Sequence, residues 1–429
     1  MRANSLETFF KILDWIFPAY FLIYFIEFYF GLWRLSSIVK LVIILLTLFY
    51  AGRIIRTARN NTDFFKLYSF YFLYCIFSCI WYVVNDVPFA CYLNELFNSL
   101  AAMIFVYVGM ADKRGNGKFY ENFANYCTIA MIVGIFLYVT TPGWYVARNL
   151  EIIENTAHIT TQYSEDTMLS MMRFSGYFKD VYEADMYAMV GLSIALFLFF
   201  LREKKTNEML IYLMIIVNFA AAILSQQRVA MASAAFTVLF YLFYGFVRKK
   251  SKQSVKIILR TVIIAAGLLT LVMVFMSDRY EQIQVLLQDR KEHMDVSEAL
   301  GERSNQHETV WKNWTMPILG KGAGSGGSVA GSYRLPHVND GGYLQILYEY
   351  GIVGFGIFAF LMLTTLLRGA RKMKYYLTEL VIISFVLAAM LGSNTLTLGY
   401  MVIIPFWYSV GRIWNNEHRR YVIENEIRI

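Results

Sequence analysis

The stretch that decides the fold class runs from residue 209 to residue 225 and reads MLIYLMIIVNFAAAILS. It contains no charged side chain, and its length matches the roughly 17 to 25 apolar residues that cross a bilayer as a helix. A second stretch of the same kind follows at 229–246 after a very short turn. Together the two stretches predict a pair of adjacent membrane-spanning helices.

Apolar stretches of similar length continue in both directions along the chain. The 429 residues are 58% hydrophobic and 16% charged, whereas a soluble domain has about a quarter of its residues charged. This composition also excludes a disordered chain, because so much apolar surface would not stay in water. We predict an all-α integral membrane protein with about twelve transmembrane helices, at 15–33, 38–51, 67–84, 93–110, 123–141, 184–201, 209–225, 229–246, 257–276, 342–367, 377–392 and 395–414.

The basic residues predict the orientation of these spans. Lys and Arg outnumber Asp and Glu by 39 to 31, and 25 of the 39 lie in every second connection or at the two termini. Positive charge in short loops marks the cytoplasmic side of a membrane protein. We therefore attribute the positive charge to topology, with no nucleic acid as a partner. The expected location is a bacterial inner membrane, crossed many times, with both termini in the cytoplasm.

Two long connections on the outer side interrupt this pattern. The expected organisation is five N-terminal spans in 1–141, a periplasmic loop at 142–183, four spans in 184–276, a large periplasmic loop at 277–341, and three spans with a cytoplasmic tail in 342–429. Long loops inside a compact protein are usually functional. Apolar residues recur at helical spacing between about 279 and 315, which predicts short amphipathic helices at the membrane surface.

The two long loops hold four of the five histidines. Histidine is the side chain best suited to proton transfer near neutral pH. His337 stands out because it comes just before the span that starts at 342, where it could reach a substrate whose lipid tail stays in the bilayer. A solvated loop histidine is the simpler alternative.

Arg228 lies in the short turn between the two stretches quoted first. Ionisable groups near the membrane are costly and usually face a cavity or a partner. Arginine stays charged and forms paired hydrogen bonds with phosphate oxygens. The functional interpretation is therefore an anion site, and the structural alternative is an arginine that extends to the lipid headgroups.

A glycine-rich stretch follows Arg303 in the second loop. Gly322, Gly324 and Gly327 match G-x-G-x-x-G by spacing, but no strand precedes them, so we reject a dinucleotide site. Two interpretations remain, a close-packed turn whose backbone amides approach an anion and a flexible hinge. No His, Cys or carboxylate cluster has metal-ligand spacing, and we expect neither a metal nor another cofactor.

Together these motifs resemble the O-antigen polymerase/ligase superfamily. The resemblance rests on a Ser-x-x-Arg turn, on an Arg…Trp…Pro-Ile-Leu-Gly-x-Gly-x-Gly loop, and on His…Tyr-Leu-Gln-x-Leu-x-Glu-x-Gly-x-x-Gly at the start of a helix. In this sequence these are Ser225 to Arg228, Arg303 to Gly324 and His337 to Gly354. Twelve spans and two large outer loops are closest to Wzy-type polymerases of O-antigen or capsule repeat units.

The resemblance implies a GT-C-like glycosyltransferase that needs no metal and acts on polyprenyl-diphosphate-linked oligosaccharides as donor and acceptor. Arg228 and Arg303 would hold the donor diphosphate, and His337 would assist the acceptor hydroxyl. In ligase-like members Asn follows the histidine closely, whereas here Asp340 stands nearer to the Tyr-Leu-Gln run. The base is therefore either His337 or Asp340.

Three further residues belong to the substrate-binding set that the resemblance implies. They are Arg173, which precedes the sixth span, and Tyr343 and Glu349, which lie in the tenth. From the residues alone, Glu349 either pairs with a neighbouring arginine or packs between helices.

Two other functions remain open from the sequence. An O-antigen ligase would transfer finished polymer to lipid A-core with the same donor chemistry. A lipid-linked-oligosaccharide flippase or other transporter would also have about twelve spans, although transporters more often show repeated halves and broken helices. For the polymerase, the bilayer, a Wzz-type chain-length regulator and a Wzx-type flippase are the expected partners.

Overall fold

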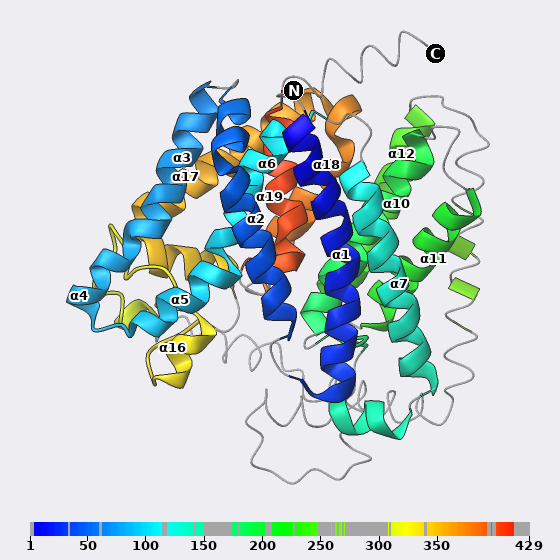
Figure 1. Ribbon diagram of the computed structural model, residues 1–429, viewed down its shortest axis with the longest axis horizontal. Coiled ribbons are helices and arrows are strands. Elements are labelled where there is room, and N and C mark those ends of the chain that lie inside the picture. The colour runs from blue at the N-terminus through cyan, green and yellow to red at the C-terminus, as the bar shows by residue number, and fades with distance from the viewer. Residues whose placement is uncertain are drawn as a thin grey trace. The chain divides into compact units, whose positions relative to one another are not determined.

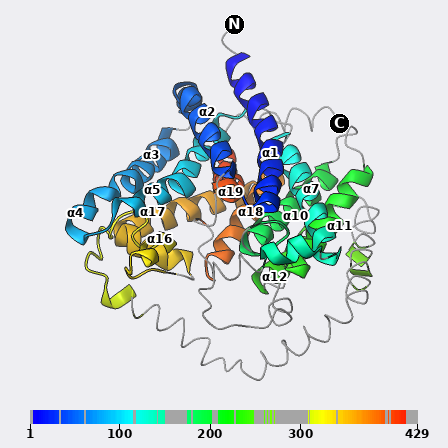
Figure 2. The same ribbon diagram turned by 60° about the horizontal axis from the view of Figure 1, so that its bottom comes forward.

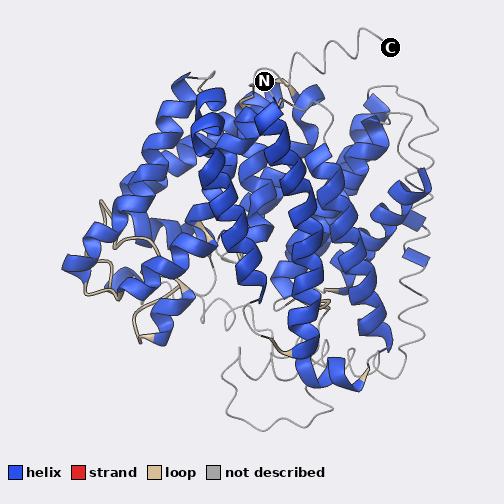
Figure 3. Ribbon diagram, viewed as in Figure 1, coloured by secondary structure: helices blue, strands red, loops and turns tan. Residues whose placement is uncertain are grey.

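A computed structural model describes most of the chain. The described residues are 4–32, 35–59, 62–113, 118–140, 142–149, 174–178, 181–201, 208–225, 228–247, 310–338, 341–392 and 400–415, with isolated positions at 259, 262, 263, 266, 267, 270, 308 and 396. Within these ranges the regular secondary structure is helical throughout (Figure 3). The prediction of an all-α protein is confirmed.

Seven of the described helices are long and apolar enough to cross a membrane. They are Leu6–Phe30, Leu35–Ala58, Asp63–Asn85, Phe89–Ala111, Phe119–Thr140, Val181–Phe199 and Gly342–Arg371. Shorter apolar helices lie at Met209–Leu224, Ala230–Tyr241 and Tyr375–Ala389. The protein is therefore a multi-pass helical membrane protein. The span predicted at 257–276 falls almost entirely outside the described residues.

The chain divides into two compact units. The first comprises 1–11, 40–118 and 299–429, and the second comprises 12–39 and 119–298. The described helices are, in order, α1 (Asn4–Phe30), α2 (Leu35–Ala58), α3 (Thr62–Phe77), η1 (Ser78–Trp81), α4 (Tyr82–Asn85), α5 (Phe89–Asn98), η2 (Leu100–Ile104), α6 (Phe105–Ala111), α7 (Lys118–Thr140), α10 (Val181–Leu201), α11 (Glu208–Leu224), α12 (Arg228–Val247), α16 (Ser328–Ser332), α17 (Gly342–Arg371), α18 (Met373–Ala389) and α19 (Tyr400–Ile413).

In the second unit α10 packs against α11 and α12 (Figure 2), and a buried amide of α11 contacts α7 and α10. Asn218 of α11 is fully buried, and its Nδ2 donates a hydrogen bond of 2.8 Å to Oγ1 of Thr128 in α7. Gly191 of α10 lies against it, since a Cβ there would come within 2.5 Å of the Asn218 Oδ1. Small residues allow helices to approach closely in membranes, where polar side chains then bond across the interface.

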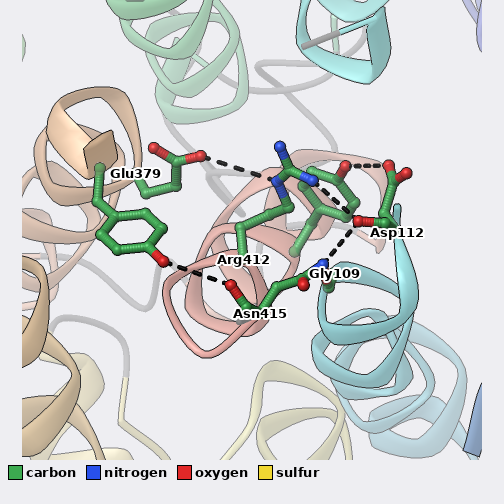
Figure 4. Close-up of polar contacts among 7 residues, drawn as sticks. Gly109, Asp112, Glu379, Arg412 and Asn415 are labelled. Atoms are coloured by element: carbon green, nitrogen blue, oxygen red, sulfur yellow. Dashed lines mark hydrogen bonds and ion pairs between the residues drawn. The ribbon is translucent and has the colours of Figure 1, made fainter. Parts of the chain in front are cut away.

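In the first unit, α6, α18 and α19 meet around a buried arginine (Figure 4). Arg412 is 1% exposed, and its Nη1 donates a hydrogen bond of 3.1 Å to the carbonyl oxygen of Asp112. Its Nε lies 4.0 Å from Oε1 of Glu379. Asn415 adds a hydrogen bond from Nδ2 to the same carbonyl of Asp112, at 2.6 Å. Such a network holds three helices together because a buried charge without a partner is very costly.

Three of the apolar spans in the first unit are interrupted, which the sequence did not predict. A 3₁₀ segment at η1 follows α3, a second one at η2 separates α5 from α6, and Gly351 breaks α17 with φ 65° and ψ −174°. These breaks occur in neighbouring elements (Figure 1). Irregular backbone at membrane depth is tolerated only where protein or a cavity surrounds it, and the same is expected around these breaks.

Candidate functional site

A glycine-rich loop, here the glycine loop (317–327), packs along α17 where that helix is broken. Its backbone forms hydrogen bonds on both sides of Gly351. The amide of Gly322 donates to the carbonyl of Glu349 at 2.8 Å, and the amide of Ile352 donates to the carbonyl of Pro317 at 2.9 Å. The glycine loop thus satisfies backbone groups that the helix would otherwise satisfy by itself.

Helix α3 and the segment after it contact the other side of the glycine loop. The hydroxyl of Tyr74 lies 2.8 Å from the carbonyl oxygen of Leu319 and 2.9 Å from that of Tyr350. The amide of Ala323 donates to Oγ of Ser78 at 2.9 Å. The glycine loop is therefore a close-packed turn, which was one of the two interpretations of this motif, and it is not a hinge free of its surroundings.

The amides of the glycine loop approach an acidic group that belongs to the protein itself. The amide of Gly326 donates a hydrogen bond of 3.2 Å to Oε1 of Glu349, and the amide of Gly324 lies close to the same carboxyl. Nε2 of Gln345 donates to this oxygen at 2.9 Å. An anion-binding turn was one of the two interpretations of this motif, and in the structure these donors are directed at the carboxyl of Glu349.

Glu95 of α5 lies beside Glu349. The two side chains are 4% and 1% exposed, and they are close enough to interact electrostatically. A Cβ on Gly327 would lie 3.9 Å from Oε2 of Glu95. Neither carboxyl forms an ion pair with a residue that the structure describes. The arginine partner considered for Glu349 is thus absent from its described contacts, and its described partners are amide groups.

A cavity of about 40 Å³ opens between these carboxyls. It combines acidic, hydroxyl and amide groups with apolar walls. Its lining residues are Tyr71, Cys75, Glu95, Ser99, Leu100, Met103, Gly342, Gln345, Ile346, Glu349, Tyr350, Leu396 and Trp407. Since one water needs about 10–15 Å³ of such volume, the cavity has room for about three small groups.

His337 lies in the segment that leads from the glycine loop to α17. It is half-buried, and its Nδ1 is 3.3 Å from the carbonyl oxygen of Leu335. Its ring packs against Gly331 of α16, where a Cβ would come within 3.0 Å of the ring. The next residue is tied to the glycine loop, because the amide of Val338 donates to the carbonyl of Gly326 at 2.9 Å. His337 is therefore held against α16, one residue before the point where the chain is bonded to the glycine loop.

Tyr343 opens α17 and anchors it to α18. Its hydroxyl donates a hydrogen bond of 2.7 Å to the carbonyl oxygen of Leu387. The side chain is half-buried, and its ring meets Phe355 edge to face at 6.5 Å. The described contacts of Tyr343 thus fix the first turn of α17 against α18.

The remaining predicted site residues are untested by this geometry. Arg173, Arg303 and Asp340 lie outside the described residues. Arg228 is the first residue of α12, as expected for a turn directly before a span. The grouping of Arg228 and Arg303 around a diphosphate stays a prediction.

Sequence analysis missed Glu95 and Ser99. Glu95 lies inside a predicted span, and a carboxylate at such a position usually marks a functional site, so a signal for it was present. Ser99 had no comparable signal, because its importance follows from the break between α5 and η2.

A scan against protein-family models and a search of the curated proteins both found no match for this chain.

Proposed function

We propose that the protein polymerises polyprenyl-diphosphate-linked oligosaccharide repeat units at the periplasmic face of the inner membrane, as a GT-C-like glycosyltransferase with twelve spans. The observation that carries the proposal is the position of His337. It is a half-buried proton acceptor on a segment that hydrogen bonds fix to the glycine loop, directly before α17. Two of the stretches that resemble the O-antigen polymerase/ligase superfamily, the glycine loop and the start of α17, are joined by these hydrogen bonds.

The chemistry of such a reaction fits these residue types. A glycosyl diphosphate is already activated, so the enzyme must stabilise the negative charge that builds on the departing diphosphate. Fixed guanidinium groups, in this proposal those of Arg228 and Arg303, do so best where water is scarce. The acceptor hydroxyl loses a proton as its oxygen attacks the sugar carbon, and His337 or Asp340 takes it up. The anchoring of Tyr343 to α18 would keep this acceptor side rigid.

A reconstituted reaction tests the proposal. The full-length protein in lipid nanodiscs, mixed with purified lipid-diphosphate-linked repeat units, should form products longer than one repeat unit without any membrane potential. The products are separated by gel electrophoresis after release from the lipid. Absence of chain growth would contradict the polymerase. In a parallel reaction that also contains lipid A-core, transfer to this acceptor with no growth between repeat units would identify the ligase.

One observation favours a second candidate, transport of a lipid-linked oligosaccharide. Broken helices around buried carboxylates are frequent in transporters, and α17 with Glu95 and Glu349 has these features. Proteoliposomes loaded with labelled lipid-linked repeat units separate the two candidates. A transporter would move the label between leaflets without extending it, whereas a polymerase would extend it.

A further inference from the structure

The cavity between Glu95 and Glu349 is lined by two carboxyl groups, and its described surroundings supply no positive charge to balance them. Both carboxyls are at least nine-tenths buried, and none of the described lining residues is a Lys or an Arg. Two like charges in a poorly hydrated site repel each other strongly, and a buried charge needs a partner of opposite sign. At least one positive charge must therefore enter the site or the carboxyls must be protonated.

Two further polar groups in the cavity lack partners. The hydroxyl of Ser99 lies next to the Glu95 carboxyl without a hydrogen bond of normal geometry, and it finds no other partner among the described residues. Ser99 is 7% exposed. The indole N–H of Trp407, which is 3% exposed, is likewise without a partner in the described part of the chain. Buried groups of this kind are normally satisfied by a ligand or by ordered water.

The end of α5 adds to the negative potential. Ser99 terminates this helix, and its amide still donates to the carbonyl of Glu95 at 2.9 Å. The C-terminus of a helix carries a partial negative charge and favours cations. Broken helices in membrane proteins use such ends, with unwound carbonyls, to coordinate Na⁺ or protons.

We propose that Glu95, Glu349 and the hydroxyl of Ser99 bind one sodium ion, with water in the remaining space. The ion would balance the carboxyl pair, and the N–H of Trp407 would donate to a water beside it. A monovalent ion fits better than a divalent one, since Oε1 of Glu349 already accepts two N–H donors, from Gly326 and Gln345. A shared proton alone would leave the cavity and the Ser99 hydroxyl without a ligand.

Binding of radiolabelled Na⁺ to the full-length protein in nanodiscs tests this site. We expect saturable binding of one ion per chain. Replacing N-methylglucamine by Na⁺ at constant ionic strength should raise the Tm by at least about 2 °C once the site is saturated. The Glu349→Gln and Glu95→Gln variants should lose saturable binding and the Na⁺-dependent rise in Tm. Ser99→Ala should weaken binding by about tenfold, the factor that corresponds to one hydrogen-bonding group.

Glu308→Gln is the matched control, because Glu308 is exposed and its ion pair among the described residues is with Lys312 on the surface. This variant should bind Na⁺ like the original protein. Should a Glu349 variant fail to fold, Ser99→Ala and the unmodified protein still decide the question. The proposal is overturned if Na⁺ does not bind saturably, if Ca²⁺ or Mg²⁺ stabilises the protein more than Na⁺ does, or if only acidification stabilises it.

Discussion

Gly320 and Gly351 lie so close together that a Cβ built on either one would come within 2.5 Å of the backbone nitrogen of the other. Both residues have left-handed backbone conformations, with φ 77° and 65°. The break in α17 and the turn of the glycine loop are therefore in direct backbone contact, one half of the contact being Gly351 and the other Gly320. Neither half is sterically available to a residue with a side chain.

Replacing Gly351 by Ala should destabilise the protein. With φ 65° and ψ −174°, Gly351 lies in a backbone region that essentially only glycine adopts and that costs another residue about 1–3 kcal/mol. The methyl group would also collide with the carbonyl of Ile318. Thermal unfolding in detergent, followed by tryptophan fluorescence, should show a lower midpoint. Gly356→Ala is the control, because it lies in the same helix with no atom near its Cβ position. Equal midpoints for the two variants would contradict the role of this contact.

The Tyr74 hydroxyl should contribute measurably to the anchoring of the glycine loop. Tyr74→Phe removes the donor for the carbonyls of Leu319 and Tyr350, and we expect a loss of about 1 kcal/mol in the free energy of unfolding. Tyr333→Phe changes the same group at an exposed position outside these contacts and should have almost no effect. Proteolysis of the native protein offers a second measurement, since cleavage within 317–327 should accelerate only for the Tyr74 variant.

Arg412 should be essential for assembly of α6, α18 and α19. Truncation to Ala leaves Glu379 without this cation inside the protein, which typically costs about 3–5 kcal/mol. We expect a strongly reduced yield of monodisperse protein on size-exclusion chromatography. Arg412→Lys should restore only part of it, because a single ammonium group cannot form the same set of hydrogen bonds. Arg371→Ala, at an exposed position, should purify like the original protein.

The proposed polymerase predicts distinct kinetic effects for its residues. Arg228→Ala and Arg303→Ala should abolish polymer while the protein still inserts into the membrane, and Arg228→Lys should restore activity poorly. His337→Ala and Asp340→Ala should be compared at saturating substrate, where the variant that loses more turnover identifies the base. A loss of about 100-fold or more is expected for a general base. Normal polymer from Arg228→Ala would refute its assignment to the diphosphate.

Much of the helical architecture could be predicted because it follows from the length and apolar character of each stretch. The span predicted at 184–201 corresponds to α10, and the turn before Arg228 separates α11 from α12. These features depend on residues adjacent in sequence, so composition and spacing were sufficient.

The breaks in α3, α5 and α17 could not be predicted in the same way. They depend on contacts with distant parts of the chain. After α3, for example, Ser78 accepts a hydrogen bond from the amide of Ala323, which lies 245 positions away, and the break in α17 is bonded to the glycine loop. The stretch around Gly351 alone is apolar enough for an unbroken helix. The pairing of Glu95 with Glu349 is likewise a consequence of tertiary packing, and no local pattern announces it.

The contact between α17 and the glycine loop also determines which parts of the second loop are free to evolve. Backbone hydrogen bonds join 317–322 to both sides of Gly351, so one inserted or deleted residue there would shift every following partner. Homologous chains that act on different substrates should therefore keep the length of this stretch constant, and insertions should accumulate elsewhere in the loop.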